Sequence, residues 1–214
     1  MTTAGWTQIA LYGALIAFLT KPIGHVIVRV YEGRLTWLAP VERLCYRLAG
    51  VDPAEDQHWT AYAAGLLLFS LVSMLLTYAV LRLQAVLPFD PDGLAAVTDR
   101  QAFETAASFT TNTNWQSYAG ESTMSHLSQM SQLAFHNFVS AAVGMGVALA
   151  FIRGISRRSA GRIGNVWADL VRGTLYLFLP ASLVLSLVFV QQGAIQNLSP
   201  TLEVTTLEGG TQAI

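Results

Sequence analysis

The stretch "SFTTNTNWQSYAGE", Ser108 to Glu121, is a ribbon of hydroxyl and amide side chains without a charge before Glu121. It belongs to a chain of 214 residues that is 53% hydrophobic and only 12% charged. Many soluble loops have this composition, but here an apolar run long enough to cross a bilayer lies on either side. The ribbon therefore decides whether the chain is a plain helical bundle or a membrane protein with a re-entrant loop.

Four stretches contain no Asp, Glu, Lys or Arg: residues 2–20, 60–81, 122–152 and 173–202. A helix needs about 20 mainly apolar residues to cross the hydrocarbon core. The pattern predicts an all-α integral membrane protein with four transmembrane helices. No basic residue precedes Lys21, so the first run lacks the start of a secretory signal. A single cysteine, Cys45, excludes an internal disulfide.

The basic residues predict the orientation. Ten of the twelve Lys and Arg residues lie within residues 21–47 and 153–172. Loops one and three share a side of the membrane, and the positive-inside bias makes that side cytoplasmic. We therefore expect a first transmembrane helix at 1–20 with the N-terminus outside, cytoplasmic loops at 21–58 and 153–172, and a fourth helix at 173–191. The tail, residues 192–214, is then outside. The acidic residues near the ribbon lie on the same side, and their negative charge either attracts cations or only solubilises the surface.

A short helix is expected directly before the ribbon. "LPFDPDG", Leu87 to Gly93, is typical of a turn, and Thr98 with Gln101 matches a capping box. The helix that follows, about 99–110, is only about 15 Å long, which is half of the hydrocarbon thickness. The chain must then return to the side from which it entered. Residues 59–152 are thus expected to form one membrane–pore–membrane repeat.

The composition of the ribbon suits a cation filter at about 110–116. Non-helical backbone survives at membrane depth only when protein buries it or when it lines a watery cavity. Hydroxyls and amides can satisfy one another there while carbonyl oxygens replace the hydration shell of an ion. The negative end of the short helix dipole also favours a cation. No glycine occurs between residues 94 and 119, so Asn112 or Asn114 is expected to take a positive φ.

These residues resemble a known family. "SFTTNTNWQSYAGE" with the following "SHLSQM" is similar to the first pore loop of the potassium-binding A subunit of Kdp-type potassium-transporting ATPases. Three further motifs also resemble that family: "VERLCYRLAGVDP" in the first cytoplasmic loop, "GNVWADLVRGTLY" before the fourth helix and "FVQQGAIQN" after it. The resemblance covers nearly all of the chain.

The resemblance implies a non-catalytic subunit that binds K⁺ from outside and passes it inward, without an organic cofactor. A separate P-type ATPase subunit and small accessory subunits would complete the complex in the bacterial inner membrane. The filter of the family is carried onto Thr111, Asn112, Thr113 and Asn114, with Thr110, Trp115 and Gln116 as flanking support or outer site. The family has four such repeats, whereas this chain holds one and the first helix of a second, which implies either a fragment or a truncated gene product.

Several alternatives remain open at the level of sequence. A passive or ion-coupled K⁺ transporter of the same superfamily would share the pore loop, and a truncated, non-conducting assembly protein would share the spans. The chain has neither a phosphate-binding GK[ST] loop nor the Asp-Lys-Thr-Gly sequence of a phosphorylated pump subunit.

His136 and Asn137 face either the ion path or a neighbouring helix, and Pro180 predicts a kink. Arg153, Arg157, Arg158 and Arg162 either contact a partner or anionic lipid or only set the topology.

Overall fold

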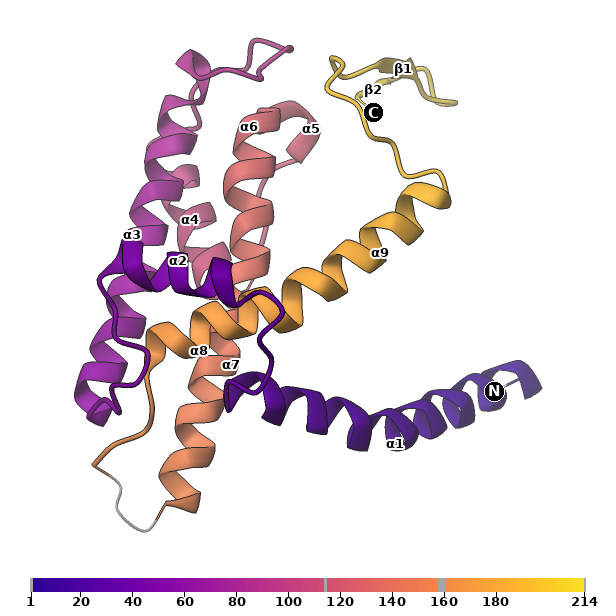
Figure 1. Ribbon diagram of the computed structural model, residues 1–214. Coiled ribbons are helices and arrows are strands. Elements are labelled where there is room, and N and C mark those ends of the chain that lie inside the picture. The colour runs from indigo at the N-terminus through magenta and orange to yellow at the C-terminus, as the bar shows by residue number, and fades with distance from the viewer. Residues whose placement is uncertain (1, 114, 158–160, 214) are drawn as a thin grey trace.

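Four helical stretches long and apolar enough to cross a membrane dominate the computed structural model, which describes residues 2–113, 115–157 and 161–213 (Figure 1). The first is α1 (Thr3–Tyr31), and the second joins α3 (Trp59–Leu83) to η1 (Gln84–Val86). The third joins α6 (His126–Ser128), η2 (Gln129–Leu133) and α7 (Ala134–Ser156). The fourth joins α8 (Val166–Arg172), η3 (Gly173–Phe178) and α9 (Leu179–Gln191). The four expected spans are confirmed.

The remaining elements are short. They are α2 (Ala39–Ala49), α4 (Asp99–Thr110), α5 (Gly120–Thr123), and the antiparallel strands β1 (Glu203–Thr205) and β2 (Thr211–Ala213). The helix α4 has the bounds that the capping pattern predicts, and it lies beside α3 and the third helical stretch (Figure 1). Thr98 is its N-cap residue, but the Thr98 hydroxyl makes no capping hydrogen bond to any described residue, so the expected capping box does not form.

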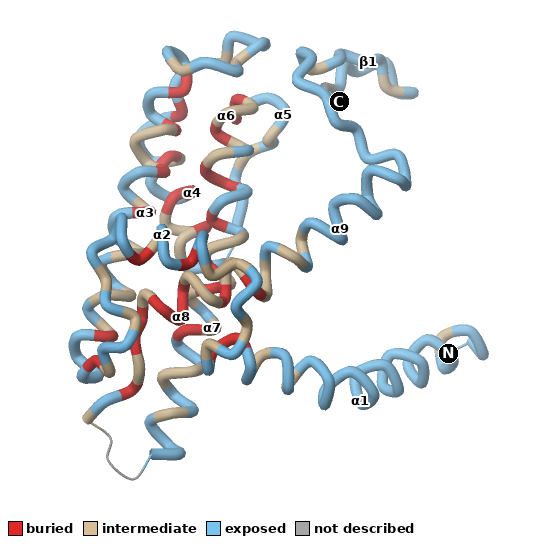
Figure 2. The backbone as a smooth tube through the Cα atoms, viewed as in Figure 1, coloured by how far each residue is buried: buried red, intermediate tan, exposed pale blue. Residues whose placement is uncertain are grey.

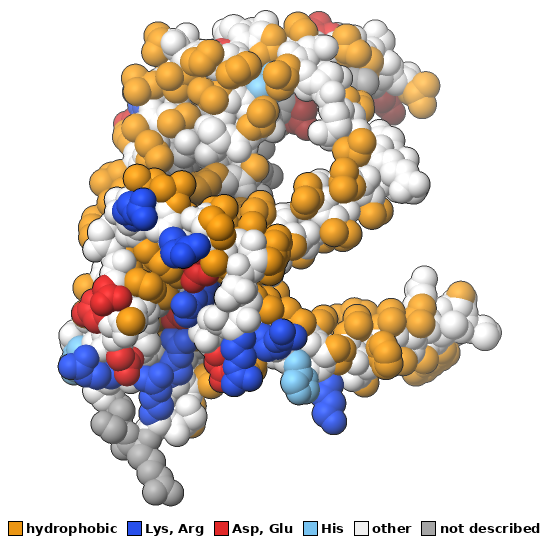
Figure 3. All heavy atoms as spheres, in the orientation of Figure 1, with side chains coloured by type: hydrophobic (Ala, Val, Ile, Leu, Met, Phe, Trp, Pro, Cys, Tyr) orange, Lys and Arg blue, Asp and Glu red, His pale blue; other side chains and the backbone are white. Residues whose placement is uncertain are grey.

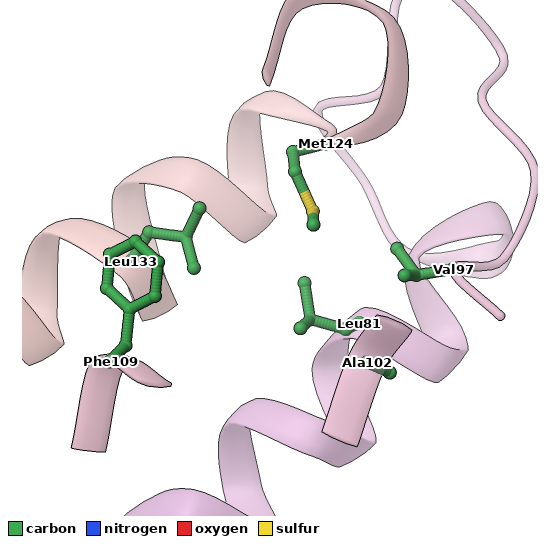
Figure 4. Packing of buried hydrophobic residues seen from close by; sticks show 6 residues of the cluster. All are labelled: Leu81, Val97, Ala102, Phe109, Met124 and Leu133. Carbon is green, nitrogen blue, oxygen red and sulfur yellow. The ribbon is translucent and has the colours of Figure 1, made fainter. Parts of the chain in front are cut away.

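The core that holds α4 in place is apolar. Its members come from α3, α4, the third helical stretch and the linkers between them, and their side chains converge in Figure 4: Leu81, Val97, Ala102, Phe109, Met124 and Leu133. Ala102 and Ala106 of α4 are fully buried, which lets the helix approach its neighbours closely. Burial of this face explains why a short helix of low average hydrophobicity stays inside the bundle.

The helix α1 and the α9 part of the fourth span are almost entirely exposed. Among their described residues, α1 buries only Val30 and Tyr31, at its C-terminal end, and α9 buries none (Figure 2). Both helices extend away from the bundle of α3, α4 and α7 (Figure 1). Their exposed residues are mostly large and apolar, as expected for segments whose surroundings are lipid or other membrane helices.

Helix boundaries differ from the expected ones at two loops. The helix α1 continues past residue 20 through Pro22 to Tyr31, because the residues after Pro22 are again apolar and helix-compatible. The fourth stretch begins at Val166, where the Asn165 side chain caps the backbone N–H groups of Trp167 and Ala168. The π-helical turn η3 lies directly before Pro180, where a ring without an N–H interrupts the regular helical ladder.

The loops meet in pairs at opposite ends of the bundle. The Gln57 N–H donates to Gly164 O at 2.8 Å, and the Ile163 N–H donates to Gln57 O at 3.1 Å, which joins loops one and three. In the other pair, the backbone N–H and the hydroxyl of Thr201 donate to Asp92 at 3.0 and 2.9 Å. Lys and Arg side chains gather at the lower end of the molecule in Figure 3. This is the pairing of loops that four alternating spans require.

Candidate ion-binding site

The helix α4 ends in a tight left-handed turn. Asn112 has a φ of 57°, so it takes the positive-φ role expected of Asn112 or Asn114. The Asn112 N–H donates to Phe109 O at 3.2 Å, and the Thr113 N–H donates to Ser108 O at 3.0 Å. This pair of bonds is a Schellman motif, which usually has glycine where Asn112 stands. The first ribbon residues therefore form a helix cap, where an extended filter strand was expected.

The cap leaves the negative end of α4 pointing at the ribbon. The N–H groups of residues 111–113 all donate backwards into the helix. In a helix the last carbonyl groups point along the axis beyond its C-terminal end, and together they carry about half a negative charge. Thr110 and Thr111 supply those last carbonyls. The helix dipole therefore favours a cation just beyond the cap.

Three hydroxyl groups line the same turn. Thr111 Oγ1 and Ser108 Oγ both lie 3.2 Å from Thr113 Oγ1. Ser108 Oγ also accepts the Trp115 N–H at 2.7 Å and donates to Trp115 O at 3.3 Å. Ser108, which the sequence did not single out, therefore joins the start of the segment 108–115 to its end. The uncharged ribbon is thus held in this shape by hydroxyl and backbone groups, without a charged side chain.

The structure brings most of the expected site residues together. Thr110 is the last residue of α4, and its buried hydroxyl has no partner among the described residues. Trp115 is 83% exposed, and Gln116 Nε2 donates to Tyr118 Oη at 3.4 Å. Asn114 lies outside the described residues. The cap and Trp115 are exposed, as expected if they form only one side of a larger site.

Gln84, which no motif in the sequence singles out, fastens both the linker before α4 and the segment after the ribbon to the end of α3. Gln84 follows the last residue of α3 and is fully buried. Its side chain bonds the linker before α4 as well as the segment after the ribbon. In the sequence it is one polar residue at the end of an apolar run, and nothing nearby signals its partners.

A second buried polar cluster joins α3 to the third helical stretch. Thr77 Oγ1 donates to Gln132 Oε1 at 3.0 Å and lies 3.1 Å from His136 Nδ1. The same Nδ1 lies 3.1 Å from the backbone oxygen of Gln132. His136 therefore bonds between helices, which was one of its two expected roles. Asn137 is exposed.

The arginines of loop three contact acidic and backbone groups of this chain. The Arg153 guanidinium donates to both carboxylate oxygens of Asp169, which also accepts the Tyr62 hydroxyl at 2.9 Å. Arg157 donates to Asp56 at 3.2 Å, and Arg162 donates to Asp56 O at 2.6 Å. The two contacts to Asp56 join loops one and three, whereas Arg158 lies outside the described residues.

A third ionic contact ties α2 to the fourth stretch. Glu42 accepts hydrogen bonds from Arg172 Nε at 2.9 Å and from the hydroxyls of Tyr46 and Tyr176, both at 2.8 Å. Burial acts to raise the pKa of Glu42, but these three hydrogen bonds and the charge of Arg172 outweigh it and hold the pKa below its ordinary value of 4.5.

The lowered pKa of Glu42 predicts a pH-dependent contribution to stability. This contribution is complete above the unfolded-state pKa and is lost as pH falls through the lower folded-state pKa. Wild-type protein is therefore expected to melt above Glu42→Gln at neutral pH, and the gap should narrow below pH 4.5. Thermal unfolding of the purified full-length subunit measures the gap. Glu32→Gln, which removes an exposed pair with Arg34, should change little at any pH. A pH-independent gap for Glu42→Gln would contradict the prediction.

Comparison with known proteins identifies the family. The profile of the potassium-transporting ATPase A subunit family, KdpA, matches residues 10–214. Proteins described as potassium-transporting ATPase potassium-binding subunits are 53% identical in a strain of Methylorubrum extorquens and 54% identical in Solibacter usitatus. Each alignment covers 100% of this chain and 38% of the relative, so the chain spans well under half of their length. The chain thus belongs to the family of potassium-transporting ATPase A subunits.

Proposed function

We propose that this chain is the N-terminal portion of the potassium-binding and translocating subunit of an ATP-driven K⁺ uptake pump. Residues 110–116 form one wall of the filter that takes K⁺ from the outer side and passes it inward. A separate P-type ATPase subunit hydrolyses ATP, and small accessory subunits complete the complex. The protein lies in the bacterial inner membrane with its N-terminus outside and with loops 21–58 and 153–172 in the cytoplasm.

The capped end of α4 is the observation that carries this proposal. It presents helix carbonyls and three hydroxyls, and it has no charged side chain between residues 105 and 120. Oxygen dipoles of this kind replace the hydration shell of a monovalent cation, whereas a carboxylate ring would favour ions of higher charge. Further repeats of the full-length subunit would close the ring around the ion.

The sidedness rests on the paired loops and on the distribution of arginine. Loops one and three share hydrogen bonds at the end of the bundle where the basic residues gather, and Asp92 meets Thr201 at the other end. The names of the relatives favour an ATP-driven complex over a passive or ion-coupled transporter. Uptake that persists without ATP would favour the passive alternative.

The filter can be tested in a full-length subunit that carries these residues and is assembled with its ATPase. Thr113→Val removes a hydroxyl of the turn, and Gln116→Ala removes the amide beside it. We expect each change to raise the K⁺ concentration that half-saturates ATP hydrolysis by about threefold to tenfold, because each removes a positioned polar group. Titration of K⁺ against competing Na⁺ measures both affinity and selectivity.

Thr98→Val is the matched control, since it removes a hydroxyl that makes no capping bond to the described residues at the far end of α4. It should leave the half-saturating K⁺ concentration unchanged. If Thr113→Val and Gln116→Ala also leave affinity and selectivity unchanged while the complex assembles, the ribbon is structural and the filter assignment is wrong.

A further inference from the structure

The Gln84 side chain is a buried amide at the outer end of α3 with every hydrogen-bonding position in use. It is 0% exposed, and an uncharged amide buried to this degree needs partners for its two donors and for its oxygen. Nε2 donates to Ala95 O at 2.7 Å and to Thr123 O at 2.8 Å. Oε1 accepts the Ser125 N–H at 3.2 Å and the Ser128 hydroxyl at 3.0 Å.

These four partners belong to the two stems of the pore loop. Ala95 lies in the linker that leads into α4, while Thr123, Ser125 and Ser128 lie where the chain has returned from the ribbon. One side chain therefore fastens the entry and the exit of the loop to the same point on α3. The amide thereby connects three separate segments, with partners 11 to 44 residues away in the sequence.

Neighbouring contacts make this anchor rigid. The Val97 N–H donates to Leu81 O at 3.1 Å, and the Arg82 guanidinium donates to Val97 O. Leu81, Val97 and Met124 pack together beside the amide contacts, and Leu133 packs against Phe109 at the far end of α4 (Figure 4). The linker that leads into the pore helix is thus held by Gln84, and the end of the helix is held by an apolar contact.

We propose that Gln84 is a positioning residue for the filter: its four hydrogen bonds set the depth of α4 and thereby the place of the carbonyl-bearing cap at its C-terminal end. This inference rests on the proposed function of residues 110–116 as a filter. A helix transmits a shift of its first turn to its last, and ion coordination by carbonyls requires placement within about half an ångström. Gln84 thus controls K⁺ affinity without contacting the ion.

Gln84→Met tests the inference, because methionine has nearly the same length but cannot make any of the four bonds. In the full-length subunit assembled with its ATPase, we expect the half-saturating K⁺ concentration to rise about fivefold or more, with weaker discrimination against Na⁺. The maximal rate per assembled complex should fall less than the affinity. A purely structural role would instead lower the amount of complex and leave the half-saturating K⁺ concentration unchanged.

Gln57→Met is the matched control, since Gln57 is also a buried amide that bonds backbone, but at the cytoplasmic end. It is expected to reduce assembly at most and to leave K⁺ affinity unchanged. Ser128→Ala is a milder variant that removes one of the four bonds of Gln84, and it should shift affinity in the same direction by a smaller factor. If Gln84→Met does not assemble, the K⁺ affinity of Ser128→Ala tests the inference on its own.

Unchanged K⁺ affinity in Ser128→Ala and in any Gln84→Met complex that assembles would overturn the inference. If Thr113→Val and Gln116→Ala shift affinity in the same assay, the proposed filter stands and only the role of Gln84 is wrong. If these ribbon variants and the Gln84 variants all leave affinity unchanged, the filter assignment fails together with the inference.

Discussion

Asp169→Ala is expected to destabilise the folded protein by about 3–5 kcal/mol, enough to abolish assembly of the subunit at physiological temperature. The Asp169 side chain is 3% exposed and the Arg153 side chain 18% exposed, and the two form a bidentate ion pair. Removal of the carboxylate leaves a desolvated guanidinium without its counter-ion, and the Tyr62 hydroxyl loses its acceptor on Asp169. The thermal midpoint of the purified full-length subunit and the yield of assembled complex measure the loss.

Two comparison variants separate this cause from a general effect of mutation. Glu32→Ala removes a carboxylate–arginine pair whose side chains are 48% and 66% exposed, and it should cost at most about 1 kcal/mol. The double variant Asp169→Ala with Arg153→Met removes both charges and should recover part of the lost stability. A double variant as unstable as the sum of its single changes would show that the pairing is not the cause.

Replacement of Asn112 by valine is expected to raise the half-saturating K⁺ concentration about tenfold or more. Asn112 has a φ of 57°, a conformation that costs an ordinary residue about 1–2 kcal/mol and a β-branched residue more. Valine would push the backbone out of this region, break the bonds to Phe109 O and Ser108 O, and rotate the carbonyls of the cap. K⁺-stimulated ATP hydrolysis by the assembled pump measures the effect.

Asn112→Gly separates the backbone from the side chain at this position. Glycine takes a positive φ freely, so a filter made of backbone carbonyls should keep its K⁺ affinity within about threefold. If glycine loses as much affinity as valine, the Asn112 side chain itself is required and the carbonyl mechanism is wrong at this position. If valine retains full affinity, the cap geometry is irrelevant to ion binding.

Much of the local structure could be predicted from the sequence, because it depends on neighbouring residues. Runs without charge predict spans, since burying an ionised group in hydrocarbon is costly. The bounds of α4 also follow the local pattern, although Thr98 makes no side-chain cap within the described structure. The absence of glycine from the ribbon indicated that an asparagine would take the positive φ, and Asn112 does so. Helix ends beyond residue 20 were less predictable, because an isolated Lys21 and Pro22 do not stop a helix whose following residues are apolar.

The tertiary structure alone decided which distant groups satisfy the buried polar atoms. Nothing in the sequence beside Gln84, Asp169 or Glu42 indicates their partners, which lie up to 134 residues away. Periodicity and charge patterns report which residues are buried, but a hydrogen bond depends on the position of two segments relative to each other. The sequence by itself therefore determined four spans, a short helix at residues 99–110 and the uncharged ribbon that follows it. How that ribbon is fastened to α3, and which carboxylate neutralises each buried arginine, depends on packing that brings the segments within about 3 Å of one another.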